Sequence, residues 1–231
     1  MQSGKKITLA MDTSASPLML AVEKDGHVYS VRRKGVKQEK LLFPALHDLL
    51  ARAGAELNDI GRVFLIRGPG RFTGIRISLT FASMLKYLSH AEVRGVTMFQ
   101  AVRFQTQSSR KFQTWQKQNP QGALAVVLHA FREEYFLQIF DDRAAGPAWL
   151  SREELLERLA AYDRPLFVAG NDKDGASLDE LLGGLYPLAD KKECKLQPAK
   201  MLAMAQDDAW EKDALEPLYL KPARFELIKP V

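Results

Sequence analysis

One short stretch constrains the fold of this chain more than any other. Residues 66–78 place three glycines and a proline within seven positions, after an apolar strand and before a long apolar run. Glycine permits positive φ angles and close backbone approach, while Pro69 fixes its own φ and disfavours helix just before it. Thr73 is placed to cap the apolar run. The stretch therefore predicts a strand, a tight turn and a capped helix over 75–88.

This turn has two interpretations. Amide hydrogens that converge where a helix begins can bind an anion, and a second, hydroxyl-rich turn follows the first strand of the chain. However, the glycine spacing fits neither a Walker loop nor the dinucleotide fingerprint. An Asx turn bonded to its own backbone explains the second turn equally well. We favour structural turns, and the alternative phosphate-binding residues are Asp12, Thr13, Ser14, Gly68, Gly70 and Thr73.

Hydrophobic periodicity predicts an α/β protein. The expected strands are 6–11, 18–22, 27–33, 62–66, 92–96, 123–128, 135–140 and 165–169, and the expected helices are 38–53, 75–88, 98–110, 151–162, 176–182 and 198–210. Asp25-Gly26 predicts a hairpin between the second and third strands. The second half echoes the first with shorter helices, which favours a duplicated fold of mixed sheets. We expect an N-terminal lobe over 1–105 and a smaller C-terminal lobe over 106–231.

Two neighbouring helices carry more apolar residues than one core contact requires. The helix over 38–53 has a widened apolar stripe around Pro44, and the helix over 75–88 is apolar almost all the way round. Such helices are expected to be buried on two sides. We therefore predict that they form an interface with another subunit. The candidate interface residues are Leu41, Leu42, Leu46, Leu49, Leu50, Phe72, Ile75, Ile77, Phe81 and Met84.

Composition limits the classes of protein that the chain can represent. The 231 residues include 33 basic and 28 acidic side chains and a single cysteine, Cys194. One cysteine makes no internal disulfide, and the sequence shows neither a signal peptide nor an apolar run of membrane-spanning length. We expect a cytoplasmic protein that does not enter a membrane.

One segment is locally basic. Residues 98–121 contain four basic residues, no acidic residue and seven glutamines interleaved with aromatic side chains. This pattern is compatible with an RNA-binding surface. A solvated helix face with an exposed loop explains it as well, and we favour that interpretation.

The sequence offers few candidates for catalysis. Its four histidines are far apart, no Cys–His cluster is present, and there is no Gly-x-Ser-x-Gly elbow. Cys194 has no histidine near it in the sequence. A nucleophilic hydrolase is therefore disfavoured, and we predict no catalytic residues, no metal and no cofactor.

Four strings in this order resemble the bacterial TsaB (YeaZ) family, the tRNA threonylcarbamoyladenosine biosynthesis proteins once described as glycoprotease-like. They are Leu9-Ala10-Met11-Asp12-Thr13-Ser14, Leu41-Leu42-Phe43-Pro44, Arg67-Gly68-Pro69-Gly70-Arg71-Phe72-Thr73-Gly74-Ile75-Arg76 and Tyr219-Leu220-Lys221-Pro222. The glycine-rich string is specific to this family and its relatives. The resemblance covers most of the chain and is looser after residue 122.

The resemblance implies a duplicated actin-like ATPase fold (ASKHA, ribonuclease H-like) with two lobes, each built around a mixed sheet with flanking helices. It also implies a non-catalytic subunit that pairs with TsaD, the transferase, and with TsaE, an ATPase, and that reaches tRNA indirectly through the complex. An isolated chain is expected to form a homodimer. The alternative is a stand-alone nucleotide-binding ATPase. A metalloprotease lacks every ligand it would need.

Three departures from the family pattern mark a divergent branch. The family usually has a histidine–serine pair where this chain has Gln38-Glu39, and an Asp-Ala-Arg string at 129–131, which here begins with His129. Lys221 stands where arginine is usual. The catalytic paralogue carries a metal-binding histidine pair in the helix that matches 38–53. The resemblance therefore implies a lost metal site here, and it leaves any nucleotide contact of the second lobe open.

Overall fold

The computed structural model describes residues 7–35, 37–143, 145–171, 177–207 and 209–221. Contacts within the chain define two compact units. The first comprises the described residues through Ala101 together with Gln197–Leu218, and the second comprises Val102–Leu196 and the described residues from Tyr219 onward. We expected one boundary at residue 105, but the contacts of residues 197–218 return that segment to the first unit.

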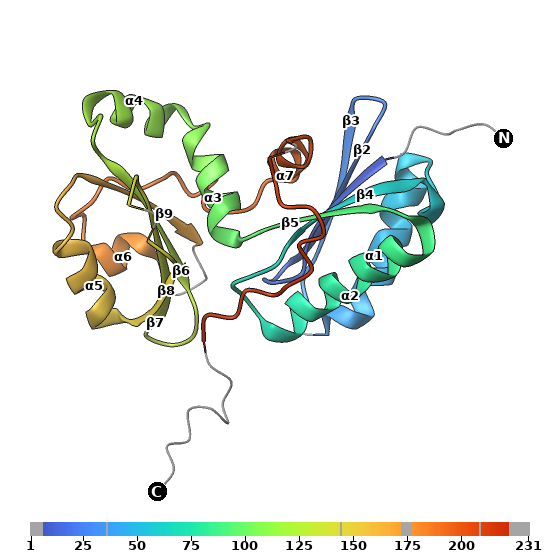
Figure 1. Cartoon of the computed structure of the whole chain (residues 1–231), viewed down its shortest axis with the longest axis horizontal. Coiled ribbons are helices and arrows are strands. Elements are labelled where there is room, and N and C mark those ends of the chain that lie inside the picture. Colours follow the sequence, from blue (N-terminus) through green and yellow to red (C-terminus); the bar gives the residue numbers. More distant parts are fainter. Residues whose placement is uncertain (1–6, 36, 144, 172–176, 208, 222–231) are drawn as a thin grey trace, which may run out of the picture. The chain divides into compact units, whose positions relative to one another are not determined.

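The first unit is built on a five-stranded mixed sheet with the order β3-β2-β1-β4-β5 (Figure 1). Its strands are β1 (Ile7–Asp12), β2 (Leu18–Lys24), β3 (His27–Arg33), β4 (Ile60–Ile66) and β5 (Glu92–Val96). β1, β4 and β5 run parallel, and β2 and β3 are antiparallel neighbours. The hairpin between β2 and β3 is confirmed, because Asp25 and Gly26 both have the positive φ that its turn requires.

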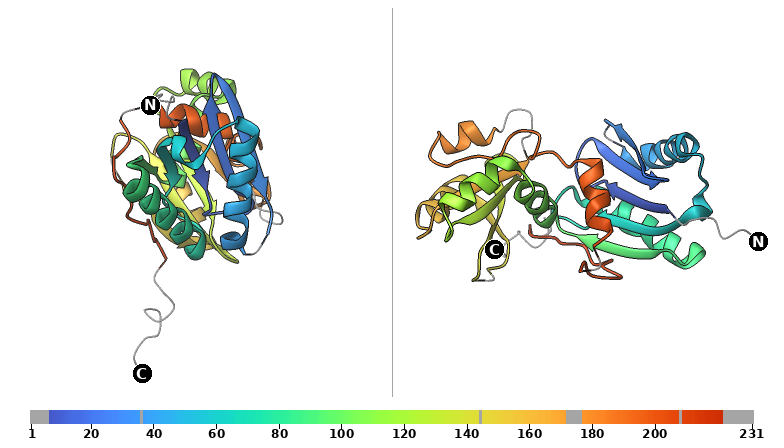
Figure 2. Two further views of the ribbon diagram at one scale, coloured as in Figure 1. Left: turned by 90° about the vertical axis from the view of Figure 1, so that its right-hand side faces the viewer. Right: turned by 90° about the horizontal axis from the view of Figure 1, so that it is seen from above.

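Helices cover both faces of this sheet (Figure 2). On one face lie α1 (Gln38–Ala53), which contacts β2 and β3, and α2 (Phe72–Ser89), which contacts β4 and β5. On the other lies α7 (Pro198–Ala205), which contacts β1 and β2. The short 3-10 helix η1 (Leu57–Asp59) precedes β4. The main core therefore lies between the sheet and the α1–α2 layer.

The second unit repeats the plan in a smaller form. Its sheet has the order β8-β7-β6-β9, with strands β6 (Ala123–His129), β7 (Glu134–Phe140), β8 (Ala148–Ser151) and β9 (Leu166–Asn171). Its helices are α4 (Arg110–Gln118), α5 (Arg152–Ala160) and α6 (Leu178–Leu182), and α3 (Met98–Gln107) leads into it from the first unit. In this sheet β8–β7 and β7–β6 are antiparallel pairs and β6–β9 is a parallel pair. The pairs β3–β2, β2–β1 and β1–β4 of the first sheet follow the same pattern. The predicted duplication is therefore confirmed.

Two helix boundaries differ from the prediction for local reasons. α2 begins at Phe72, with extended Arg71 as its N-cap, so Thr73 lies inside the first turn and the predicted Thr73 cap is wrong. The predicted helix over 98–110 ends at Gln107, because Ser109 has an extended backbone and its hydroxyl accepts the amide of Phe112 to start α4. The helix is not interrupted at Pro44, because α1 continues through this residue.

Candidate functional site

The turn after β1 and the glycine-rich turn after β4 lie directly against each other. The Thr13 hydroxyl donates to the Gly74 carbonyl oxygen at 2.6 Å, and the Arg71 amide donates to the Ser14 carbonyl oxygen at 2.7 Å. The Ser14 amide and hydroxyl both donate to one Asp12 carboxylate oxygen, at 2.8 and 2.7 Å. The two segments are thus joined by backbone and hydroxyl hydrogen bonds.

The glycines permit this contact by having no side chain. A Cβ atom at Gly74 would lie 1.9 Å from the Thr13 carbonyl oxygen, and one at Gly70 would lie 2.6 Å from that of Ser14. Gly68 has a φ of 123° and approaches the Leu218 carbonyl oxygen, which would be 2.4 Å from an added Cβ. Close backbone approach explains all three glycines without a ligand.

This geometry favours the structural interpretation of the predicted phosphate-binding residues. Asp12, Thr13 and Ser14 are buried, and the hydroxyls of Thr13 and Ser14 already donate to protein oxygens. A phosphate between the turns would have to displace the backbone contacts made by Gly70 and Gly74. Nucleotide binding at these residues is therefore not supported by the contacts.

Asp12 is a buried acid whose charge is poorly compensated. Burial raises the pKa of Asp12, and the two hydrogen bonds from Ser14 oppose that rise without cancelling it. The native state therefore binds more protons at this group than the unfolded chain does. Stability from this group falls as the pH rises through the raised pKa. Above that pKa the buried Asp12 carboxylate lowers the free energy of unfolding.

We expect Asp12→Asn to raise the thermal midpoint at pH 7, because the amide oxygen still accepts both Ser14 bonds while the buried charge is removed. The gain should shrink as the pH falls through the raised pKa of Asp12, because the native carboxyl then becomes neutral. Scanning calorimetry at several pH values measures it, and Asp48→Asn on the exposed face of α1 is the control. A midpoint that falls equally at every pH would contradict this account.

Gln38 occupies the start of α1, where the family pattern has histidine. Its side chain is 3% exposed, and its amide nitrogen donates to the Ala15 carbonyl oxygen at 2.5 Å. It therefore ties α1 to the turn after β1. Among the described residues, no three His, Cys, Asp or Glu side chains converge into a set that could hold a metal ion.

The two other divergent residues lie in the second unit. His129 stacks edge-on against Tyr135 with ring centroids 5.5 Å apart, and its Nε2 lies 2.7 Å from the Arg132 carbonyl oxygen. The Lys221 ammonium pairs with Glu134 and lies 5.1 Å from the ring centroid of Trp149. Both residues have partners within their own unit, which gives each a structural role.

The predicted interface residues divide into core and surface. The buried members pack between the helices and the sheet of their own unit, so they offer a partner little surface. They are Leu42, Leu46, Leu49, Leu50, Ile75 and Phe81. The remaining members, Leu41, Phe72, Ile77 and Met84, are partly or fully exposed. The candidate interface is therefore narrower than the sequence suggested.

An apolar groove of about 400 Å³ lies between α1 and α2. We call it the α1–α2 groove; it is lined by Glu39, Leu42, Phe43, Phe72, Thr73, Arg76, Ile77, Thr80, Phe81 and Met84. Phe43 is 57% exposed and Phe72 is 52% exposed, although both are large and apolar. Phe43 meets Phe81 edge-on with ring centroids 5.7 Å apart, so the groove is continuous with the core.

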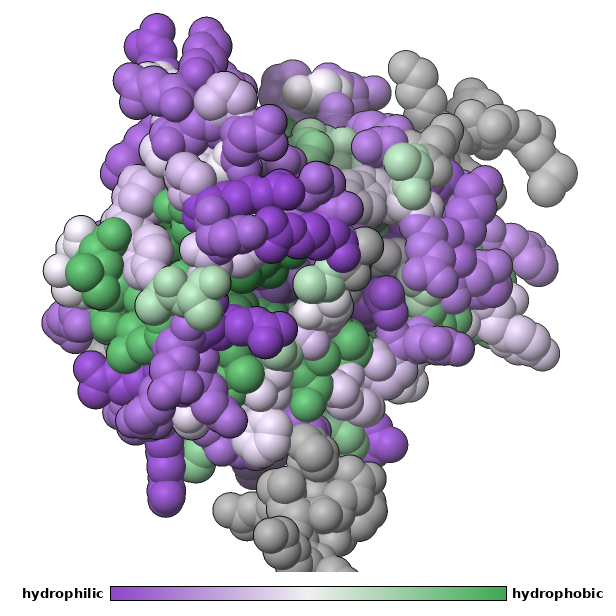
Figure 3. All heavy atoms as spheres, turned by 60° about the vertical axis from the view of Figure 1, so that its left-hand side comes forward, coloured by the Kyte–Doolittle hydropathy of each residue, from purple (hydrophilic) through white to green (hydrophobic). Residues whose placement is uncertain are grey.

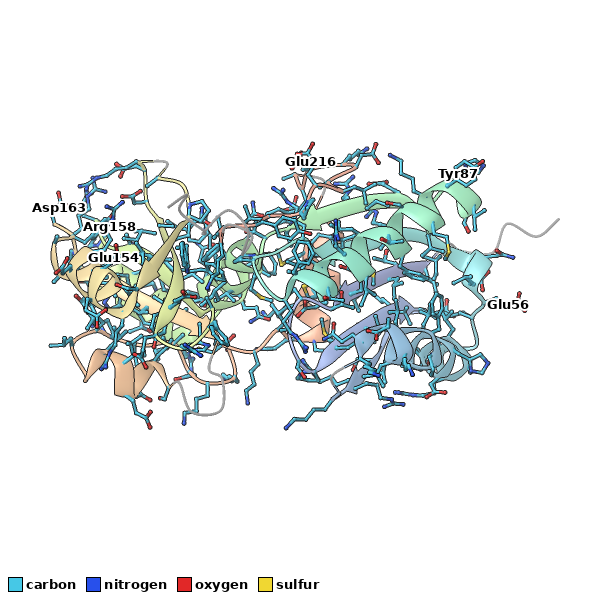
Figure 4. All side chains as sticks on the ribbon, turned by 90° about the horizontal axis from the view of Figure 1, so that it is seen from below. Glu56, Tyr87, Glu154, Arg158, Asp163 and Glu216 are labelled. Carbon is cyan, nitrogen blue, oxygen red and sulfur yellow. The ribbon has the colours of Figure 1, made fainter. Side chains whose placement is uncertain are left out.

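The exposed apolar surface continues along α2. Tyr87 and Leu88 are 83% and 66% exposed at its C-terminal end, where Figure 4 labels Tyr87. The prediction omitted these two residues and Phe43 from the interface. The sequence did indicate the exposure of Phe43, because this residue lies off the apolar stripe that Leu42 and Leu46 define on α1.

Comparisons with known proteins agree with this architecture. The family model described as TsaD, tRNA N6-adenosine threonylcarbamoyltransferase, matches residues 37–156, which is more than half of the chain. TsaB of Bacillus subtilis is 22% identical over 229 residues, covering 94% of this chain and 95% of that protein. TsaB of Buchnera aphidicola from Schizaphis graminum is 34% identical over 92 residues, covering 39% and 44%.

Among solved structures, YeaZ from Pseudomonas aeruginosa matches 93% of this chain and 100% of its own, with a TM-score of 0.63 and 22% identity. The two mixed sheets with their flanking helices thus define a protein of the duplicated actin-like ATPase fold. Within that class, the chain belongs to the TsaB (YeaZ) branch of the TsaD family. No helix of the described residues is both long and apolar enough to cross a bilayer.

Proposed function

We propose that this protein acts in the biosynthesis of tRNA threonylcarbamoyladenosine as a non-catalytic subunit that binds a TsaD-type partner through the α1–α2 groove. The curated relatives carry the name of that pathway. The observation that supports a binding role is the pair of exposed phenylalanines, Phe43 and Phe72, on neighbouring helices. Contiguous exposed apolar surface on a soluble domain is typical of interaction sites.

The contacts of the ancestral turns support a non-catalytic role. Ser14 donates to Asp12 and Thr13 donates to the Gly74 carbonyl oxygen, while the side-chain amide of Gln38 at the start of α1 donates to the Ala15 carbonyl oxygen. A stand-alone ATPase would need open phosphate contacts at these turns. We therefore prefer the scaffold role, in which TsaE joins the complex and tRNA is reached through it, in the cytoplasm.

The groove has the chemistry of a helical interface. Fully burying one large apolar side chain contributes about 1.5–3 kcal/mol, so two phenylalanines contribute enough to decide association. Glu39 and Arg76 lie at the same groove and provide polar rim contacts. In the absence of a TsaD-type partner, we expect the same surface to pair two copies of this chain.

The test is co-elution with the TsaD-type protein of the same organism. We expect the double variant Phe43→Asp/Phe72→Asp to weaken binding at least about hundredfold, since two apolar anchors are lost and charges are placed in their pockets. Leu185→Asp is the matched control, because Leu185 is 74% exposed in the second unit. Circular dichroism establishes that the variants remain folded.

Three results would contradict the proposal. The first is that the folded wild-type chain and the folded TsaD-type protein do not co-elute. The second is that the double variant binds as tightly as the wild type. The third is that Leu185→Asp weakens binding as much as the double variant does. The last outcome would place the interface on the second unit. Leu46 and Phe81, although apolar, are unsuitable test positions because both are buried in the core.

A further inference from the structure

The second unit carries a cluster of lysine and arginine side chains on α4 and on the turn at 190–195. We call it the α4 basic surface, and it consists of Arg110, Lys111, Lys117, Lys191, Lys192 and Lys195, all exposed. The only acidic residues in 98–121 and 190–195 are Asp190 and Glu193. Glu193 is buried. Positive charge therefore dominates this surface.

Specific contacts hold the two segments side by side. The side-chain amide of Gln105 on α3 donates to the carbonyl oxygens of Glu193 and Lys195, at 2.8 and 3.2 Å. The Lys111 ammonium lies 3.3 Å from an Asp190 carboxylate oxygen. The turn at 190–195 is thus fixed beside α3 and α4. The six cations therefore form one surface rather than two separate groups.

The aromatic residues of the segment have a different role. Phe112 and Trp115 on α4 pack against Phe167 of β9, with ring centroids 5.2 and 5.3 Å apart. This packing turns the opposite face of α4, with Arg110 and Lys117, to solvent. Seven residues of helix separate these two cations by about 10 Å along the axis. Hydrophilic side chains crowd the upper part of the second unit in Figure 3, the height at which Figure 1 places α4.

We propose that the α4 basic surface binds the phosphate backbone of RNA. Lysine and arginine bind phosphates directly, and glutamine side chains add hydrogen bonds to phosphate and sugar; Gln107, Gln113 and Gln118 are exposed on the same helices. The choice of RNA over DNA rests on the proposed function, since the substrate of that pathway is a tRNA. The chain would then contact the substrate itself, in addition to its protein partner.

A lipid surface fits these residues less well. A helix that lies on a membrane presents apolar side chains beside its basic ones. None of the large apolar side chains that are exposed among the described residues lies in 98–121 or 190–195. The aromatic residues of α4 are engaged with β9. The surface is therefore polar throughout, as a phosphate-binding surface should be.

The experiment measures fluorescence anisotropy of a labelled, unmodified tRNA transcript with the full chain at several salt concentrations. We expect salt-dependent binding, and the variant Arg110→Gln/Lys117→Gln should lower the slope of log K against log salt by about one for each cation removed. The control Arg152→Gln/Arg158→Gln removes the same charge from α5, where Figure 4 labels Arg158, and should leave the slope unchanged.

Several outcomes would overturn the inference. They are no binding of the transcript, equal loss in both double variants, or binding to vesicles containing phosphatidylserine in place of RNA. Co-elution with the TsaD-type partner is measured in parallel. The α4 variant should retain it, because the α1–α2 groove is unchanged. A negative RNA result with intact co-elution would therefore reject this inference and leave the scaffold proposal standing.

Discussion

Gly74→Ala is expected to destabilise the first unit more than the replacement of any other glycine of that unit by alanine. The new Cβ would lie 1.9 Å from the Thr13 carbonyl oxygen and 2.9 Å from the Gln38 side-chain oxygen. Neither neighbour can move freely, because Thr13 donates to the Gly74 carbonyl oxygen and Gln38 donates to that of Ala15. Relief therefore requires β1 and α2 to separate.

We expect a loss of about 3 kcal/mol or more in the free energy of unfolding, at or beyond the upper end of the range for overpacking. For a chain of this size, 3 kcal/mol corresponds to a fall of roughly 6–12 °C in the thermal midpoint. Urea titration and scanning calorimetry measure both quantities. Unchanged stability would contradict this account, because it would show that the turn after β1 is not held against Gly74.

Gly146→Ala is the matched control. It adds the same methyl group, but nothing lies within 4 Å of the new atom. We expect a change within about 0.5 kcal/mol. Equal destabilisation by both substitutions would show that the Gly74 contact with the turn after β1 has no special weight.

Local sequence signals predicted most elements of the fold. Alternation and turn residues placed β3 and β5 with the observed bounds, and the helix predicted from residue 151 is found as α5, with a capping box from Ser151 to Glu154 at its start. β8 was missed, because its four residues are too short to show a periodic pattern. The start of α2 was placed late because the prediction assigned Thr73 the capping position that Arg71 holds.

The roles of particular side chains were harder to predict than the elements. The sequence showed that α1 and α2 are too apolar for one core contact, but it could not separate buried Leu46 from exposed Phe43. That distinction depends on how the helix is rotated over the sheet. Likewise, a glycine allows either a ligand or another backbone segment to approach closely. At Gly74, the position of the Thr13 carbonyl oxygen shows that it is a backbone segment.

Long-range contacts carry no local signal at all. Arg94, which is 1% exposed in the middle of β5, is one of the residues that join residues 197–218 to the first unit. Its guanidinium donates to the carbonyl oxygens of Asp207 and Trp210, more than a hundred residues away, at 3.2 and 3.5 Å. In the sequence this residue is simply one of two charged residues in a five-residue strand.

Arg94→Met is accordingly the second substitution for which we expect a large effect. Methionine fills a similar volume, but the two carbonyl oxygens lose their donor and the carboxylate of Glu92 loses the Arg94 guanidinium that pairs with it. Removing one member of a buried ion pair typically costs 3–5 kcal/mol. Glu92 is 32% exposed and keeps Arg62 at 3.5 Å, so we expect a loss no larger than the lower end, about 3 kcal/mol.

The loss should be local as well as global. The Asp213 amide donates to the Val93 carbonyl oxygen at 2.8 Å, beside the anchor that Arg94 provides. We therefore expect faster hydrogen exchange across 209–215 in the variant. Arg158→Met removes an exposed arginine from α5 and is the control; it should change neither stability nor exchange by a comparable amount.

The acid dependence of stability distinguishes ion pairing from simple packing. Burial raises the pKa of Glu92, but the Arg94 hydrogen bond and the charges of Arg62 and Arg94 outweigh it, so the pKa lies below its ordinary value. A depressed carboxyl pKa gives stability that is present above the ordinary value and is lost as the pH falls through the folded one. Arg94→Met should therefore flatten the acid limb of the stability curve. The double variant Glu92→Gln/Arg94→Met should be more stable than Arg94→Met, because it no longer has a carboxylate without its arginine. If the stability losses of the two single variants simply add in the double variant, Arg94 acts by packing alone.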